Sequence, residues 1–138
     1  MHCAFTNNVG GWNAGAVAFG VVSDSTFFGN HSPAAGGALF KCTATRCVFS
    51  GDYSDLDYQK PGGAAECALS DCDVACSIGG CSATRCTFHD INATRDLAVF
   101  YNCNWVTNSL ITRCRTYLRG IVYGYNASDV ASEFVSCT

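Results

Sequence analysis

The stretch Cys3-Ala4-Phe5-Thr6-Asn7-Asn8 decides the fold, because versions of it return along the whole chain. Each version has a small residue followed two positions later by an apolar anchor, and in the first three versions a polar residue follows three positions after the anchor. The anchors are Phe5, Phe27, Phe49, Val74, Phe88, Ile111 and Phe134, separated by 22, 22, 25, 14, 23 and 23 residues. Self-similarity at a period of roughly 20–50 residues indicates a solenoid, a propeller or another repeat array.

A second apolar segment follows most anchors, after a stretch rich in turn-forming residues. The clearest of these segments are 15–19, 36–40 and 62–65, and 97–100 and 120–123 are later versions. The fourth repeat has only 14 residues between Val74 and Phe88, which indicates that a long loop has been trimmed there. No segment long enough for a helix has apolar residues at the 3.6-residue helical spacing.

A repeat of about 22 residues with two or three short β segments cannot bury its apolar face alone, but stacked repeats can. We therefore predict an all-β fold, a single-stranded right-handed parallel β-helix of about six coils that spans residues 1–138 as one domain. We expect the chain to be a mature piece or a segment of a longer solenoid or assembly. Leucine-rich repeats require a Leu-x-x-Leu-x-Leu frame that is missing, and a β-sandwich would not keep the anchors in phase.

Two motifs pair up in the first half of the chain. Phe5-Thr-Asn-Asn8 and Phe27-Phe-Gly-Asn30 are followed by Ala14-Gly-Ala-Val17 and Gly36-Gly-Ala-Leu39, and residues 49–52 with 62–65 give a looser third pair. This combination resembles the repeat of the chlamydial polymorphic outer-membrane proteins. The resemblance implies a right-handed β-helix that serves as a surface stalk or adhesin, without catalytic residues.

Composition excludes several classes of partner. The formal charge is −3, and the 8 Lys and Arg residues are scattered, so neither nucleic acid nor an anionic membrane surface is expected to bind. No apolar run approaches the roughly 18 residues of a membrane span, so we expect no membrane insertion. The start of the chain also lacks the charged-then-apolar layout of a signal peptide.

Cysteine is unusually frequent, with 11 residues in a chain of 138. Proteins of reducing compartments seldom carry so many thiols, and three glycosylation motifs begin at Asn30, Asn92 and Asn126. Together these features predict an extracellular or cell-surface protein that carries N-linked glycans. The alternative is a bacterial surface protein in which the three motifs have no meaning.

Cysteines one coil apart meet the distance that a disulfide requires, whereas five extended residues within a coil span too far. The spacing predicts inter-coil disulfides drawn from Cys42–Cys67, Cys47–Cys72, Cys81–Cys103 and Cys114–Cys137, with Cys72–Cys86 competing with Cys47–Cys72. The alternative is that some of these residues are small buried thiols. The odd total leaves at least one thiol free or bonded to another chain, and Cys3 is the candidate.

Metal and enzyme sites have weaker signals. Cys72, Cys76, Cys81, Cys86 and His89 contain zinc-like spacings, but a β-helix would spread them along the stack. Carboxylates or bases for polysaccharide cleavage could come from Asp52, Asp55 and Asp57, from Asp71 and Asp73, or from Arg113 and Arg115. The four motifs of the polygalacturonases are absent. We predict no catalytic residues, no cofactor and no metal site.

Three hypotheses for function follow. The first is a structural module of an extracellular fibre or cell-surface appendage, in which copies of the chain join head to tail through uncapped β-helix ends and disulfides link the coils. The second is an adhesin or glycan-binding stalk that uses aromatic side chains of its loops, with the candidates Trp12, Tyr53, Tyr58 and Trp105. The third is a polysaccharide lyase or hydrolase.

Overall fold

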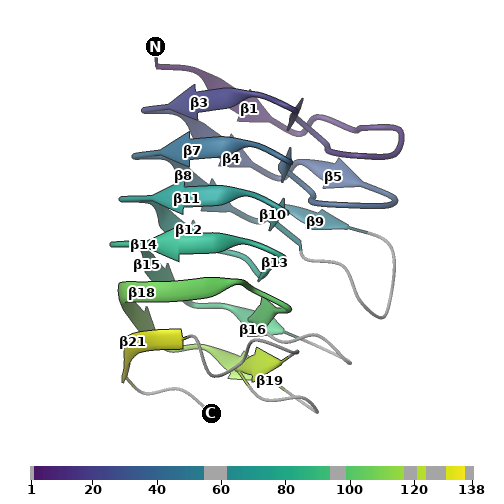
Figure 1. The fold of residues 1–138 in the computed structure, drawn as a ribbon. Coiled ribbons are helices and arrows are strands. Elements are labelled where there is room, and N and C mark those ends of the chain that lie inside the picture. The colour runs from purple at the N-terminus through teal and green to yellow at the C-terminus, as the bar shows by residue number, and fades with distance from the viewer. Residues whose placement is uncertain (1, 55–61, 94–98, 117–120, 124–129, 136–138) are drawn as a thin grey trace.

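The computed structural model describes residues 2–54, 62–93, 99–116, 121–123 and 130–135. The residues in these ranges form strands, turns and bends, and none of them is helical. Successive coils of the chain lie on top of one another, from the purple first coil to the yellow last strand (Figure 1). All strand pairs are parallel. The predicted parallel β-helix is therefore confirmed. None of the described segments is a helix that could cross a membrane.

Three strand positions recur in each coil. The first position, which contains the anchors, is occupied by β1 (Ala4–Thr6), β4 (Thr26–Phe28), β8 (Val48–Ser50), β12 (Asp73–Ala75) and β15 (Thr87–His89). The second position is occupied by β3 (Val21–Ser23), β7 (Thr43–Thr45), β11 (Ala68–Ser70) and β14 (Ser82–Thr84). The long strand β18 (Trp105–Thr112) pairs with both β14 and β15, and β21 (Val130–Val135) pairs with β18.

The third position forms a separate sheet. Its strands are β2 (Val17–Ala18), β6 (Leu39–Phe40), β10 (Ala64–Ala65), β13 (Ile78–Gly79), β17 (Phe100–Tyr101) and β20 (Val122–Tyr123), in this order. Two short pairs lie outside these faces, β5 (His31–Ser32) with β9 (Tyr53–Ser54) and β16 (Asn92–Ala93) with β19 (Arg115–Thr116).

The anchors form one interior column, as the repeat predicts. Strand pairing aligns Phe5 with Phe27, Phe27 with Phe49, and so on through Val74, Phe88, Ile111 and Phe134. The rings of Phe5 and Phe27 stack 4.8 Å apart at 3°, and those of Phe27 and Phe49 stack 4.9 Å apart at 8°. Phe27, Phe49 and Phe88 are at most 1% exposed. Their burial supplies the main hydrophobic contribution to folding.

The short fourth coil keeps the column in phase. Ala75 ends β12, and Ile78 begins β13 after only Cys76 and Ser77. The strand β13 pairs with β10 and β17, so the third sheet continues without interruption. The coil has therefore lost a loop between two strands and has kept both strands.

Glycines of the Gly-Gly-Ala motif stand where neighbouring coils approach too closely for a side chain. A Cβ atom on Gly37 would lie 2.1 Å from the carbonyl oxygen of Gly62 and 2.4 Å from the backbone nitrogen of Tyr53. A Cβ atom on Gly15 would lie 2.1 Å from the carbonyl oxygen of Gly37. Backbone atoms cannot yield as the end of a flexible side chain can, which explains why glycine recurs at this point of the repeat.

Most cysteines occupy one kind of corner. The residue before each of them has a positive φ angle, for example 51° at Lys41 before Cys42 and 52° at Glu66 before Cys67. The left-handed conformation turns the chain sharply and is uncommon for residues other than glycine. Serine takes the same place at Ser25 and Ser109, which follow Asp24 and Asn108. The corner thus requires a small side chain with a hydrogen-bonding atom.

The corner thiols bond to the backbone, and neighbouring thiols of one column also contact each other. The thiol of Cys67 donates to the carbonyl oxygen of Ala65 at 3.1 Å and accepts from the N–H of Cys42 at 3.3 Å. The hydroxyl of Ser25 makes the same two bonds: it donates to the carbonyl oxygen of Ser23 at 2.7 Å and accepts from the backbone N–H of Cys3 at 3.3 Å. The sulfurs of seven corner cysteines donate in this way to the carbonyl oxygen two residues earlier, at Cys42, Cys47, Cys67, Cys72, Cys81, Cys86 and Cys114.

Among the described residues, no disulfide joins the predicted partners Cys42, Cys47, Cys67, Cys72, Cys81 and Cys103. The pairs Cys42–Cys67 and Cys47–Cys72 do lie in register on neighbouring coils, but their sulfurs are used as corner hydrogen-bonding groups. Cys81 and Cys103 are likewise buried free thiols. The pair Cys114–Cys137 cannot be placed, since Cys137 lies outside the described residues. The described cysteines from Cys42 to Cys114 are buried in this structure.

Candidate functional site

A groove crosses the coils on the outer side of the third sheet. Strand register places Ala18, Phe40, Ala65, Gly79 and Tyr101 in one column that points away from the core. Phe40 and Tyr101 carry large rings, and the two positions between them carry a methyl group and a hydrogen atom. The column is therefore hollow in the middle, and the groove has a volume of about 420 Å³.

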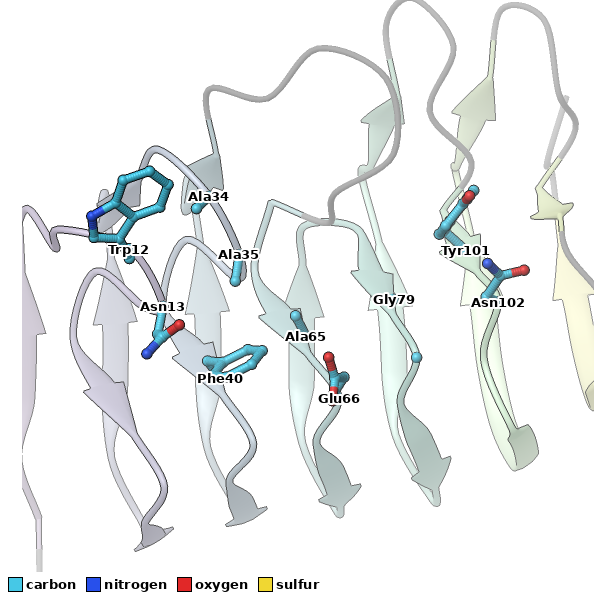
Figure 2. Close-up of a pocket in the computed structure, with 11 residues that line it drawn as sticks. Trp12, Asn13, Ala34, Ala35, Phe40, Ala65, Glu66, Gly79, Tyr101 and Asn102 are labelled. Carbon is cyan, nitrogen blue, oxygen red and sulfur yellow. The ribbon is translucent and has the colours of Figure 1, made fainter.

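Loops and corner residues complete the rim of this groove. Figure 2 shows Trp12 and Asn13 at the first-coil end, Ala34 and Ala35 beside them, and Tyr101 with Asn102 at the other end. Glu66 lies between the two ends, next to the small residues of the floor (Figure 2). The indole of Trp12 is 79% exposed, so an aromatic surface is open to solvent here.

The charge of the groove is close to balanced. The Nζ atom of Lys41 lies 3.4 Å from the Oε2 atom of Glu66, and both side chains are about half exposed. The same ammonium group lies 5.2 Å from the centre of the Phe40 ring. The other polar side chains of the rim, Asn13 and Asn102, are neutral amides. The groove thus presents aromatic surface and amide groups without an excess of either sign.

A buried polar ladder runs beside the anchor column. The Oδ1 atom of Asn30 accepts from the backbone N–H and the side-chain amide of Asn8, at 3.1 and 2.8 Å. The Oδ1 atom of Asp52 accepts from the same two groups of Asn30, both at 2.8 Å. Asn30 of the Phe-x-x-Asn motif therefore ties the second coil to the first and to the third.

Asp52 ends this ladder as a buried acid. It is 4% exposed, and its Oδ2 atom has no hydrogen-bond partner among the described residues. Burial raises the pKa of Asp52 to about 6, and the two hydrogen bonds from Asn30 limit the rise. A carboxyl group in this position serves the ladder and is not open to a substrate in solution.

Asn30 does not present a glycosylation site in the folded chain. Its side chain is fully buried, and its amide nitrogen donates to the Phe5 carbonyl oxygen at 3.0 Å as well as to Asp52. Asn92, at the start of β16, is exposed. Asn126 lies outside the described residues.

Alternating charges line the corners on the outside of the stack. Arg46 makes two hydrogen bonds to Asp24, at 2.6 and 2.7 Å, and Arg85 makes two to Asp71, at 2.7 and 2.8 Å. The Arg46 guanidinium lowers the pKa of Asp24 to about 2, and Arg85 lowers the pKa of Asp71. These residues have the positive φ angles of the corners, so opposite charges stack where the backbone turns.

His89 joins two carboxylates on the outer side of β12 and β15. Its Nε2 atom lies 2.7 Å from Asp73, and its Nδ1 atom lies 2.8 Å from Asp90. Arg113 binds Asp90 through two hydrogen bonds of 2.6 and 2.9 Å, and this contact and the one to His89 lower the pKa of Asp90. Most of these residues line an open hollow of about 500 Å³.

Three of the enzyme candidates from the sequence, Asp71, Asp73 and Arg113, line this hollow, and each is held in an ion pair. Asp52 is buried, Asp71 is bound to Arg85, Asp73 to His89 and Arg113 to Asp90. Arg115 lies on β19, and Asp55 and Asp57 lie outside the described residues. In the part of the chain that the structure describes, no three His, Cys, Asp or Glu side chains are placed to hold a metal ion.

The aromatic candidates for ligand binding are also dispersed. Trp12 lines the groove, Tyr53 stacks on His31 with ring centres 4.5 Å apart, and Trp105 begins β18 on another face. Tyr58 lies outside the described residues. Sequence reasoning missed Phe40, Glu66 and Tyr101, although aligning the Gly-Gly-Ala segments would have placed Phe40 and the small residues Ala65 and Gly79 in one column.

Comparisons of the chain with protein-family models, with curated proteins and with solved structures gave no match in any of the three.

Proposed function

We propose that this chain is a structural module that assembles head to tail with further copies of itself, in an extracellular fibre or a cell-surface appendage. The observation that supports the proposal is the open edge of the first coil. Among the described residues, strands β1, β2 and β3 each pair with one strand, on the side of the second coil. An unpaired strand edge recruits another strand of matching geometry.

The backbone of the first coil shows which groups such a contact would use. Cys3 and Asn7 bond to β4, and Gly20 and Asp24 bond to β7. Because neighbouring peptide groups of a strand point in opposite directions, the N–H and C=O groups of Ala4, Thr6, Val21 and Ser23 point away from the second coil. These groups form the ladder that a further coil would complete.

The interior of the same coil also supports stacking. One face of the Phe5 ring packs on Phe27, and Phe5, Val17 and Val22 are only partly buried, whereas the equivalent Phe27 and Leu39 are at most 1% exposed. A coil placed on this end would bury the remaining apolar area. A contact between two different ends repeats without closing, so it produces a filament.

An extracellular location is part of the proposal, but its support has changed. The cysteines are explained by the corners, so they no longer argue for an oxidising compartment. The exposed motif at Asn92 still favours a secreted protein. Hydrogen bonds between coils replace the predicted cross-links as the stabilising contacts.

Light scattering on a size-exclusion column tests the assembly. We expect a series of oligomers whose mass grows with protein concentration, and we expect Thr6→Lys/Val21→Lys to reduce them to monomers, since lysines on an edge oppose strand pairing. The matched control is Phe28→Lys/Thr43→Lys, which changes the paired positions one coil further in. A wild-type monomer at all concentrations, or equal behaviour of the two variants, would contradict the proposal.

A further inference from the structure

We propose that the groove on the third sheet binds a neutral oligosaccharide, laid along the axis of the stack across several coils. This function is separate from head-to-tail assembly, because the groove lies on the side of the stack and the assembly contact lies at its end. It gives a defined place to the glycan-binding hypothesis, with residues that differ from most of those the sequence suggested.

The shape of the groove suits a short chain of rings. Phe40 and Tyr101 are three coil steps apart, which is about 14 Å at the ~4.8 Å spacing of paired strands. The floor between them consists of Ala65 and Gly79, so a flat ligand can approach the sheet closely. Trp12 adds a second aromatic group on the rim at the first-coil end, on the loop near Ala34 (Figure 2).

The side chains match the two chemical faces of a sugar. A pyranose ring has an apolar C–H face, which packs on an aromatic ring, and an edge of hydroxyl groups, which needs donors and acceptors. Phe40, Tyr101 and Trp12 offer the first kind of contact, and the rim offers the second through Asn13, Glu66 and Asn102. Sites for small ligands commonly combine a largely apolar lining with a few polar groups that fix orientation.

The charges of the groove favour a neutral polysaccharide over an anionic or a cationic one. Glu66 is paired with Lys41, and the rim also has the amides Asn13 and Asn102, so the described lining of the groove has no cationic surplus for a polyuronate or a sulfated glycan. A strongly cationic ligand would compete with Lys41 for the same carboxylate. A neutral chain of hydroxylated rings meets neither obstacle.

An extended peptide fits the groove less well. Peptides that bind to sheets usually add a strand at an open edge. The strands β6, β10, β13 and β17 beneath the groove are each paired on both sides, so no backbone edge is open there. A purely apolar ligand would displace water from Glu66 and from the two amides without offering hydrogen bonds in its place.

Isothermal titration calorimetry of the whole chain with neutral hexasaccharides of glucose, mannose and xylose, and with a galacturonic acid hexasaccharide, tests the inference. We expect at least one neutral hexasaccharide to bind and the anionic one to bind at least tenfold more weakly. Tyr101→Ala and Trp12→Ala should each weaken binding about tenfold or more, as loss of a central aromatic contact does. Tyr101→Phe should retain most of the affinity.

The matched control is Trp105→Ala, which removes an exposed indole from a different face of the stack. Circular dichroism checks that each variant keeps its β structure. The Trp12 side chain is exposed, so its replacement by alanine leaves the core intact. Three results would overturn the inference: no binding of any neutral hexasaccharide, stronger binding of the anionic one, or an equal loss with Trp105→Ala and Trp12→Ala.

Discussion

The backbone N–H of Cys42 donates to the sulfur of Cys67, 3.3 Å away on the next coil, although the two residues are 25 positions apart in the sequence. The N–H of Cys67 donates to Cys81 in the same way, also at 3.3 Å. A column of thiols therefore joins successive corners by hydrogen bonds. Each sulfur does what the hydroxyl of Ser25 or Ser109 does at other corners.

The first prediction concerns this replacement of oxygen by sulfur. Cys67→Ser should change the free energy of unfolding by less than about 1 kcal/mol, because a hydroxyl keeps both corner hydrogen bonds. Cys67→Ala should destabilise the protein by about 1–3 kcal/mol, since it leaves the N–H of Cys42 without a partner and opens a small cavity. Urea denaturation followed by circular dichroism measures both changes.

A reducing agent gives an independent check on the same corners. Dithiothreitol should leave the melting temperature unchanged, because no disulfide joins the described cysteines. Burial raises the pKa of Cys103 to about 12, so this thiol stays protonated and reacts slowly with oxidants. A large drop in melting temperature with reductant would show that disulfides form in solution.

Asp52 should make stability depend on pH in an unusual direction. Its pKa rises from 3.8 to about 6 on folding, so the folded state binds the proton more tightly than the unfolded state. The stabilisation from protonation is complete below about pH 4 and is lost as the pH rises through 6. We expect unfolding to cost up to about 3 kcal/mol more at pH 4 than at pH 7 from this group.

Asp52→Asn isolates that effect. The amide keeps an oxygen for the two hydrogen bonds from Asn30 and removes the titration, so the slope between pH 4 and 6 should vanish. Asp24 and Asp71 act in the opposite sense and at lower pH, because arginine lowers the pKa of each. Their contribution is lost only as the pH falls below about 4. Equal slopes in wild type and variant would contradict the assignment to Asp52.

Gly37 provides a test of coil spacing. Gly37→Ala should destabilise the protein by about 3 kcal/mol or more, since the new methyl group would overlap the backbone of Gly62 and Tyr53. Gly11→Ala is the control, because a Cβ atom there would have no neighbour within 4 Å. Thermal unfolding of the two variants in parallel measures the difference, and similar melting temperatures would refute the close approach.

The glycosylation motifs should differ in occupancy. If the chain is expressed through a eukaryotic secretory pathway, mass mapping should find a glycan on the exposed Asn92 and none on Asn30. Asn30→Gln serves as the folding control, because the longer side chain disturbs the ladder to Asp52 and should lower stability without removing a glycan. A glycan on Asn30 would mean that modification precedes or prevents closure of this ladder.

The sequence predicts the stacking of this protein well, because the phase of the anchors depends on coil length and not on details of loops. Phe27 lies 22 residues after Phe5 and pairs with it, and the shortened interval to Phe88 is accommodated by the missing loop. The same intervals separate Asp24 from Arg46, Asp71 from Arg85 and Asp90 from Arg113. The outer ion pairs could therefore have been predicted from spacing.

Spacing alone could not predict the chemistry of the cysteines or the groove. Register brings the backbones of Cys47 and Cys72 together, but the direction of each sulfur depends on the left-handed residue before it. The groove depends on which positions of the third sheet carry small residues, and loops of unequal length hide that alignment. The register of the third sheet places Ala65 and Gly79 between Phe40 and Tyr101, and only this register shows that the two rings border one groove.

The fourth coil has a practical consequence for engineering. It connects β12 to β13 through two residues and β13 to β14 through two more, yet it pairs with the longer coils on either side. It is thus shorter than the coils on either side, which differ from it by longer loops between the same strands. A foreign peptide inserted between Cys76 and Ser77 would be displayed at a fixed height on the rod, and whole frames of this length could be copied to lengthen the rod.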